Sequence, residues 1–288
     1  NQLEFDDEVG YQATRKIYEL ARGNDKRPFL LMASFTHPHD PYATRKAYWD
    51  RYDHDAIDMP TVPAMGYDNL DSHSQRIHDL CAMGEKQITD SDIRNARHAY
   101  YGNTTYFDDW LGKILRTLDE SGLRDNTIII VLSDHGDMLG ERGLWYKMTF
   151  FEGATRVPMI VSAPERFSAS RIANNVSLLD LLPTLVDLAN PDQNTAPEFS
   201  DRVDGRSLVP LMTGDFNDDS DEAIGEMLCE GAIAPCMMIR RGRFKFIHSD
   251  PDPDQLFDLK NDPDEMKNLW DDPAYYETKL EMMEVLAR

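Results

Sequence analysis

Asp134 and His135 follow an apolar stretch after one serine, a position that is typical of ligand-binding residues. The stretch covers residues 127–132, is too short for a membrane span, and is typical of a buried strand. Ligands of parallel α/β sheets bind just beyond the carboxyl ends of the strands. A carboxylate beside an imidazole at such an edge predicts part of a site for a divalent metal, with Gly136 letting the backbone turn sharply. A turn that caps a helix is the alternative interpretation.

Two further side chains can donate hydrogen bonds to an anion. His39 lies in a proline-bounded loop after a second apolar run, residues 28–35, and Lys147 lies ten residues beyond Asp137. An ordinary loop histidine and an ordinary surface lysine are the alternatives.

An α/β fold is expected to position these residues. Strands are predicted at 28–35, 127–132 and 157–162, and helices at 11–22, 91–122 and 177–188, the last with Pro183 marking a kink or a fresh first turn. Residues 42–85 are predicted to be an irregular excursion over the surface. Three parallel strands are too few for a sheet that two helix layers cover, so strands are expected to be missing.

The C-terminal part is predicted to be a small unit of its own. Short strands at 223–229, 237–241 and 243–248, with a hairpin tip at 241–242, precede an amphipathic helix at 272–288. Residues 190–217 are rich in Pro, Asp, Asn and Gly, which indicates a boundary. We therefore expect an α/β domain over 1–217 and an α+β subdomain over 218–288.

Composition narrows the possible partners. The chain has 30 Lys and Arg against 52 Asp and Glu, which gives a formal net charge of −22. This charge argues against binding to nucleic acid or to an anionic membrane, because both need a basic face. Three unclustered cysteines favour a reducing, cytoplasmic compartment. A signal peptide would be invisible, because the sequence begins at Asn1 in what looks like the middle of a longer chain.

Several motifs in the same order resemble the type I sulfatases of the alkaline phosphatase superfamily. They are residues 34–41, 133–137 and 140–158. Further stretches resemble the choline sulfatases more narrowly, namely 143–147, 230–235 and 238–242, and residues 255–263 match the end of the family's C-terminal sheet.

The resemblance implies a fold and an activity. The fold would be an alkaline-phosphatase-like sandwich with a mostly parallel sheet, incomplete here, and a small C-terminal antiparallel sheet with a helix. The activity would be hydrolysis of sulfuric esters, with choline sulfate releasing choline and sulfate. The nucleophile would be a formylglycine made from the Cys or Ser of a Cys/Ser-x-Pro/Ala-x-Arg motif, and the enzyme would be a homo-oligomer.

The resemblance also implies roles for particular residues. Asp134 and His135 would be ligands of a divalent cation, usually calcium, and His39 and Lys147 would contact the sulfate. Both side chains are suitable donors to the negative charge that develops on the leaving oxygen. His39 is favoured over His37 because the family's histidine stands two residues before a proline, as His39 stands before Pro41. Glu230 would face the quaternary ammonium of choline, where a carboxylate and aromatic rings suit a cation. Its alternatives are a solvent-exposed carboxylate and, more weakly, Glu226 in the same role.

The sequence departs from the family at the nucleophile. Cys81, Cys229 and Cys236 are not followed by the residues of the formylglycine motif. We therefore expect the nucleophile in an N-terminal portion that this chain lacks, and we expect the chain alone to be inactive. A phosphonate monoester hydrolase or phosphodiesterase of the same superfamily, and a non-catalytic binding module, remain open as alternatives.

Overall fold

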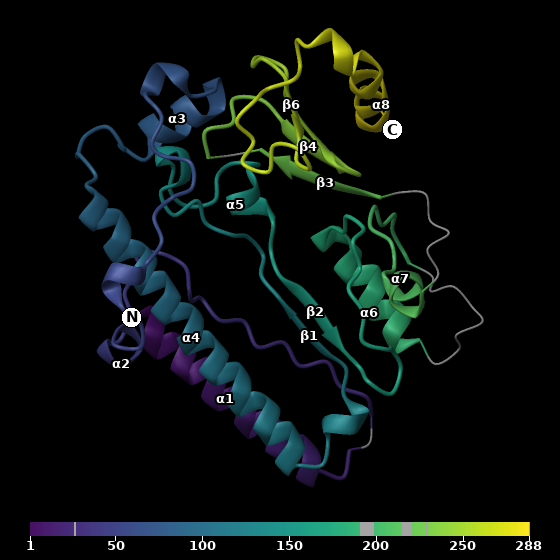
Figure 1. The fold of residues 1–288 in the computed structure, drawn as a ribbon. Helices are drawn as coiled ribbons and strands as arrows, with labels where there is room; N and C mark the ends of the chain where they lie inside the picture. Colours follow the sequence, from purple (N-terminus) through teal and green to yellow (C-terminus); the bar gives the residue numbers. More distant parts are fainter. Residues whose placement is uncertain (26, 191–198, 215–220, 229, 288) are drawn as a thin grey trace.

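The computed structural model describes residues 1–25, 27–190, 199–214, 221–228 and 230–287. Two long helices flank a pair of strands, smaller helices lie on the other side of that pair, and a four-stranded sheet with one helix stands at one end (Figure 1). The helices are α1 (Gln2–Arg22), α2 (Lys46–Trp49), α3 (Ser72–Leu80), α4 (Asp90–Glu120), α5 (Glu152–Thr155), α6 (Leu181–Ala189), α7 (Val209–Thr213) and α8 (Tyr276–Leu286). The strands are β1 (Ile129–Leu132), β2 (Met159–Ser162), β3 (Glu222–Met227), β4 (Cys236–Arg241), β5 (Phe244–Ser249) and β6 (Gln255–Asp258).

Helices α1 and α4 lie side by side along one flank (Figure 1). A Cβ at Gly10 would approach the ring of Trp110 to 2.3 Å, so a glycine is needed where the two helices come closest. The predicted helix at 91–122 is confirmed, but its N-cap is Thr89, which forms a capping box with Asp92. The predicted helix at 11–22 begins earlier, because the Asn1 side chain caps α1 by accepting from the amide of Leu3.

The α/β class is confirmed, but β1 and β2 pair antiparallel, with Ile129 opposite Ser162 and Leu132 opposite Met159. Parallel pairing was expected. A parallel return needs a crossover connection, usually a helix, whereas the segment between these strands contains only short helical turns and reverses the chain direction. The strands are also less covered than expected, since β1 is half-buried and Ile160 is 59% exposed.

The predicted strand at 28–35 is wrong for the described chain. The segment is extended and runs between α4 and β1 (Figure 1), but it has no strand partner among the described residues. Leu30 and Met32 are 79% and 85% exposed. A strand exists only when a neighbour pairs its backbone groups, so an apolar run alone does not create one.

Residues 42–85 are less irregular than expected. They contain α3, whose first turn is capped by the side chain of Asp71. The helix at 177–188 is confirmed as a 3-10 turn at 178–180 followed by α6, so that Pro183 lies in the fresh first turn of α6. The predicted boundary at 190–217 contains α7 and lies partly outside the described residues.

The C-terminal strands form the expected antiparallel sheet, in the order β3-β4-β5-β6. Gly242 has a positive φ of 51° at the tip of the β4–β5 hairpin, a conformation that glycine adopts readily. Helix α8 covers one face of the sheet, where Met282 and Val285 pack with buried strand residues, namely Ile239, Phe246 and Leu256. Among the described residues, no helix has the length and apolarity needed to cross a membrane.

Candidate active site

The side chains of His39, His135 and Lys147 converge from three separate segments. The Nζ atom of Lys147 lies 3.1 Å from Nε2 of His135 and 3.4 Å from Nε2 of His39. The two imidazole rings meet edge to face, with their centroids 5.5 Å apart. The sequence separates Lys147 from His39 by 108 residues, so the fold is what assembles this cluster.

Hydrogen bonds on the far side of each ring fix the tautomers. Nδ1 of His135 lies 2.7 Å from the carbonyl oxygen of Gly136, and Nδ1 of His39 lies 3.0 Å from the carbonyl oxygen of Asp40 and 2.8 Å from its carboxylate. Carbonyl oxygen only accepts, so each Nδ1 carries the proton and each Nε2 presents a lone pair to the Lys147 ammonium. The cluster is therefore one cationic donor held between two neutral acceptors.

Asp137 holds the segments of the cluster together. Its carboxylate accepts hydrogen bonds from the amides of Leu139 and Tyr146, at 2.9 and 3.1 Å, and from the hydroxyl of Tyr42 at 2.9 Å. Burial raises the pKa of Asp137, and these hydrogen bonds oppose that rise. Because Tyr42 follows His39 and Tyr146 precedes Lys147, this one side chain links both segments to the end of β1.

Gly136 is required for a reason other than the expected sharp turn. It is not among the residues with positive φ. A Cβ there would lie 2.1 Å from the carbonyl oxygen of Gly153, and the Gly136 amide donates to the carbonyl of Ala154 at 2.7 Å. The glycine thus lets α5 approach the backbone beside His135.

Asp134 and His135 have the chemistry of two metal ligands. The Asp134 side chain is 83% exposed and offers carboxylate oxygens, which suit hard divalent cations. The His135 ring donates through Nδ1 to a backbone carbonyl, the arrangement that commonly orients a metal-binding histidine, and leaves Nε2 free of a proton. No group of three His, Cys, Asp or Glu suited to a metal occurs among the described residues. The two residues therefore fit part of a ligand set.

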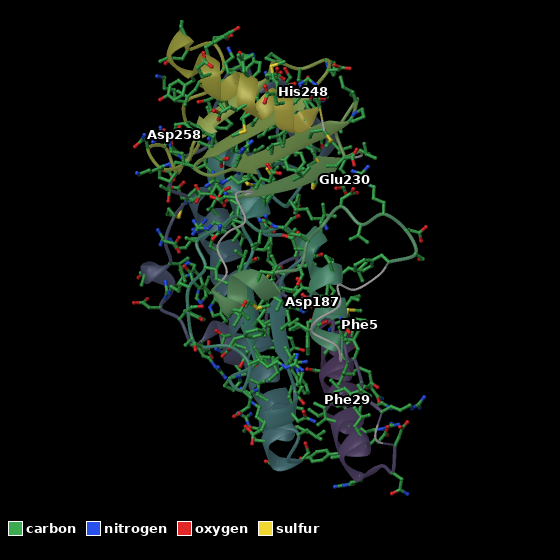
Figure 2. The ribbon with its side chains drawn as sticks, turned by 90° about the vertical axis from the view of Figure 1, so that its right-hand side faces the viewer. Phe5, Phe29, Asp187, Glu230, His248 and Asp258 are labelled. Carbon is green, nitrogen blue, oxygen red and sulfur yellow. The ribbon has the colours of Figure 1, made fainter. Side chains whose placement is uncertain are left out.

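Glu230 lies apart from the cluster, in the turn that leads into β4. It is exposed, has a positive φ of 54°, and stands at the border between the C-terminal sheet and the rest of the molecule (Figure 2). Burial and the charge of Glu230 both raise the pKa of the Cys81 thiol, and Cys81 is in turn among the groups that raise the pKa of Tyr146. Glu230 is therefore within electrostatic reach of Cys81, the residue that follows α3. Glu226 is exposed on β3, opposite Met237 of β4.

His37, which was not favoured, is part of the interior. Its side chain is 1% exposed, and its Nδ1 lies 2.6 Å from the fully buried carboxylate of Asp6. Burial alone would raise the pKa of Asp6, but hydrogen bonds from His37 and from the amide of Thr36 lower it on balance. His37 thus ties α1 to the loop that carries His39.

The nucleophile motif needs a correction. Ser162-Ala-Pro-Glu-Arg166 does have the Ser-x-Pro-x-Arg spacing, although we expected no such stretch in this chain. Ser162 pairs with Ile129, at the opposite end of the strand pair from Asp134, and three residues of strand alone span about 10 Å. Arg166 donates to the carbonyl of Leu188 at the end of α6. The register thus places this serine away from the cluster.

Sequence reasoning missed Asp40, Tyr42 and Tyr146 as parts of the site. Tyr42 stands near Trp145 and Tyr100, with ring centroids 6.1 and 6.4 Å away. Burial raises the pKa of Tyr100 to about 12, so this phenol stays neutral at ordinary pH. The signal that could have found Asp40 and Tyr146 is their adjacency to His39 and Lys147.

Comparisons with known proteins agree on one family. The profile described as Sulfatase matches residues 4–191, and the profile described as N-sulphoglucosamine sulphohydrolase, C-terminal, matches residues 140–288. A choline-sulfatase of Rhizobium meliloti is 42% identical over 95% of this chain and 53% of its own length. An arylsulfatase of Clostridium perfringens is 32% identical over 90% of this chain and 52% of its own length.

Solved structures share the fold. The phosphonate monoester hydrolase of Agrobacterium radiobacter superposes with a TM-score of 0.75 at 27% identity, covering 97% of this chain and 59% of the other. This chain therefore spans about half the length of the curated relatives it matches.

Proposed function

The chain belongs to the sulfatase family, and from this premise we propose that it forms the central and C-terminal part of a choline sulfatase. The observation that carries the proposal is the Lys147 ammonium held between Nε2 of His39 and Nε2 of His135, next to the exposed carboxylate of Asp134. Lys147 would donate to an anionic ester, and Asp134 and His135 would offer oxygen and nitrogen ligands to a cation once the ammonium donates to the ester instead of to His135. The similarity to a choline-sulfatase supports choline sulfate as the substrate.

Each of these residues would have a defined task in hydrolysis. A divalent cation, proposed to be calcium, and a formylglycine from outside this chain would together supply polarisation of the sulfate and the attacking oxygen. Asp134 and His135 would hold the cation. Lys147 would donate a hydrogen bond to the sulfate, where negative charge accumulates as the ester bond breaks.

His39 would carry the proton for the leaving group. When its ring is protonated, Nε2 can deliver a proton to the oxygen that leaves with choline, as the S–O bond to that oxygen breaks. The Asp40 carboxylate, 2.8 Å from Nδ1, would orient the ring and stabilise its positive charge. Glu230 would pair with the trimethylammonium group of the substrate.

Other parts of the proposal concern the whole protein. We propose a bacterial cytoplasmic homo-oligomer whose α/β domain continues to residue 217 and whose C-terminal subdomain covers 218–288. The antiparallel sheet and α8 support the second unit. The odd number of cysteines supports a reducing compartment.

A phosphonate monoester hydrolase is the second candidate, favoured by the structural match at 27% identity. Parallel assays of the complete protein on choline sulfate and on a phosphonate monoester separate the two. We expect kcat/KM for choline sulfate to be higher by about 100-fold or more, because Glu230 would recognise only a cationic substrate. A higher kcat/KM for the phosphonate would instead support the second candidate.

A further inference from the structure

The guanidinium of Arg76, on α3, ties together three segments that are distant in sequence. Its Nε donates to the carbonyl oxygen of Gly231 at 2.7 Å, and its Nη1 donates to Asp252 at 2.9 Å, while Nη2 bonds the second oxygen of the same carboxylate. The two side chains are only 23% and 11% exposed. A bidentate pair of this kind fixes the plane of the guanidinium and thereby the direction of the remaining Nε–H donor.

The turn that Arg76 holds is the one that presents Glu230. Glu230 and Gly231 have positive φ angles of 54° and 93°, and a non-glycine residue keeps such a conformation only when its surroundings enforce it. A Cβ at Gly231 would lie 2.7 Å from the side chain of Ile77, so the turn rests directly on α3. Helix α3 is therefore the surface that sets the turn's conformation.

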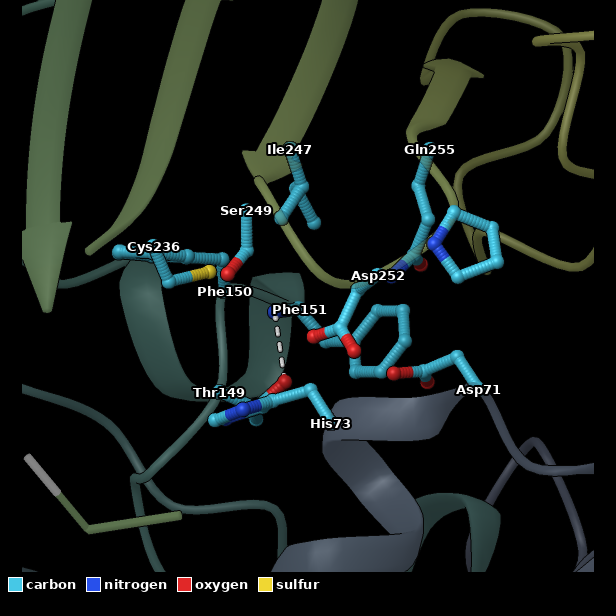
Figure 3. A pocket seen from close by; sticks show the side chains of 11 residues that line it. Asp71, His73, Thr149, Phe150, Phe151, Cys236, Ile247, Ser249, Asp252 and Gln255 are labelled. Atoms are coloured by element: carbon cyan, nitrogen blue, oxygen red, sulfur yellow. Dashed lines mark hydrogen bonds between the residues drawn. The ribbon is translucent and has the colours of Figure 1, made fainter. Parts of the chain in front are cut away.

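Helix α3 is also fixed to the segment that carries Lys147. Nε2 of His73 bonds the carbonyl oxygen of Met148 at 2.8 Å. Figure 3 shows His73 and Asp71 facing Asp252 and the strand residue Ser249 across a small cavity. One short helix thus connects the residue after Lys147 with the residue after Glu230.

We infer that Arg76 is a positioning residue that sets where Glu230 stands relative to Lys147, and so decides how well a cationic sulfate ester is recognised. The inference rests on the proposed function, because it assigns Glu230 to the substrate's cationic end. Arg76 acts through the Gly231 carbonyl and does not itself touch the substrate. Asp252 fixes the orientation of the Arg76 guanidinium through its two hydrogen bonds.

The kinetic test uses the complete enzyme with the variants Arg76→Met, Glu230→Gln and their combination. Choline sulfate is compared with 4-nitrophenyl sulfate, whose leaving group carries no positive charge. We expect Arg76→Met to raise KM for choline sulfate about tenfold, with kcat and the KM for 4-nitrophenyl sulfate little changed. The combined variant should be no worse than Glu230→Gln alone, because both changes remove the same contact.

The matched control is Arg51→Met, which removes an exposed arginine that also forms a pair with a carboxylate, that of Asp109. It should leave both KM values unchanged. If Glu230→Gln shows no preference between the two substrates, the proposed recognition of choline by Glu230 is wrong. If Glu230→Gln is selective and Arg76→Met is not, or if Arg76→Met weakens both substrates equally, only the role of Arg76 is overturned.

A second readout does not depend on activity. The charge of Glu230 helps to raise the pKa of the Cys81 thiol, after burial. Displacement of the turn should therefore speed alkylation of Cys81 by iodoacetamide at pH 8, measured by peptide mapping of the complete protein. If Arg76→Met does not fold, Arg76→Lys is used in its place. A lysine keeps the positive charge, but its single ammonium group cannot reproduce the planar guanidinium that binds both Gly231 and Asp252. A Cys81 rate equal to that of the unmodified protein in the folded variant would overturn the inference.

Discussion

Replacing Lys147 by alanine in the complete enzyme is expected to lower kcat for choline sulfate by about 100- to 1,000-fold, the usual effect of removing one preorganised donor to developing negative charge. Lys147 is the one cationic side chain in the cluster that the described residues form, and it sits 3.1 and 3.4 Å from the two ring nitrogens. Its loss removes the ammonium donor to the sulfate. The binding of the substrate's choline end should be much less affected.

Steady-state kinetics of the Lys147→Ala variant measure this effect directly. Lys46→Ala is the matched control, because Lys46 is 85% exposed and forms a surface ion pair with Asp50, the C-cap residue of α2. Circular dichroism should show the same fold in both variants. A change in kcat of less than threefold for Lys147→Ala would contradict the assignment of this lysine to the sulfate.

Replacing Lys245 by methionine is expected to cost about 3–5 kcal/mol of unfolding free energy, since it breaks a buried ionic group and leaves carboxylates without their partner. The Lys245 side chain is 1% exposed on β5, and its Nζ lies 2.6 Å from Glu152 and 2.8 Å from both Glu265 and the carbonyl of Phe150. This contact joins the C-terminal sheet to the segment that follows Lys147. Loss of this contact should therefore destabilise the segment next to Lys147 as well as the C-terminal sheet.

The same variant should show a characteristic dependence on pH. Burial raises the pKa of Glu265, and the charge of Lys245 opposes that rise. Without the lysine, the pKa of Glu265 in the folded protein should rise further. The charged carboxylate then costs folding free energy at neutral pH. This cost falls as the pH is lowered through the folded-state pKa, because the carboxyl becomes protonated. Urea unfolding at pH 7 and pH 5 should thus show a smaller deficit at pH 5.

Lys260→Met is the control for this experiment, because Lys260 is an exposed lysine in the loop after β6. Its stability should match that of the unmodified protein at both values of pH. A Lys245→Met deficit within about 1 kcal/mol of the control would mean that the buried ionic group contributes little, as buried ion pairs sometimes do.

The elements that sequence predicted best are those that local signals specify. Helix α4 has apolar spacing along its length and a polar cap at its start, and the β4–β5 hairpin has Gly242 at its tip. The run at 28–35 has equally strong apolar character but no partner strand among the described residues, and pairing is a property that a run does not carry by itself. Helix α3 was not predicted because its buried positions include the polar residues His73 and Ser74, which interrupt an apolar pattern.

The candidate site was predictable in part. Family motifs pointed to His39, His135 and Lys147, which the fold brings together, and their proposed roles stay predictions. A sequence motif does not predict where a residue lies in three dimensions. Ser162 has the spacing of the nucleophile motif, but the register of β1 and β2 places it away from the cluster. The hydrogen bond between Arg76 and Gly231 joins residues 155 positions apart, and no local sequence pattern predicts it.

Turnover of choline sulfate by the purified 288-residue chain, compared with the complete protein that includes the N-terminal portion, tests the central claim most directly. The claim is that this chain holds the donors and part of the cation site, while the nucleophile lies outside it. We predict sulfate release by the complete protein and none above the buffer background by this chain alone. Sustained sulfate release by the chain alone would contradict the account, and would direct attention to a nucleophile within residues 1–288.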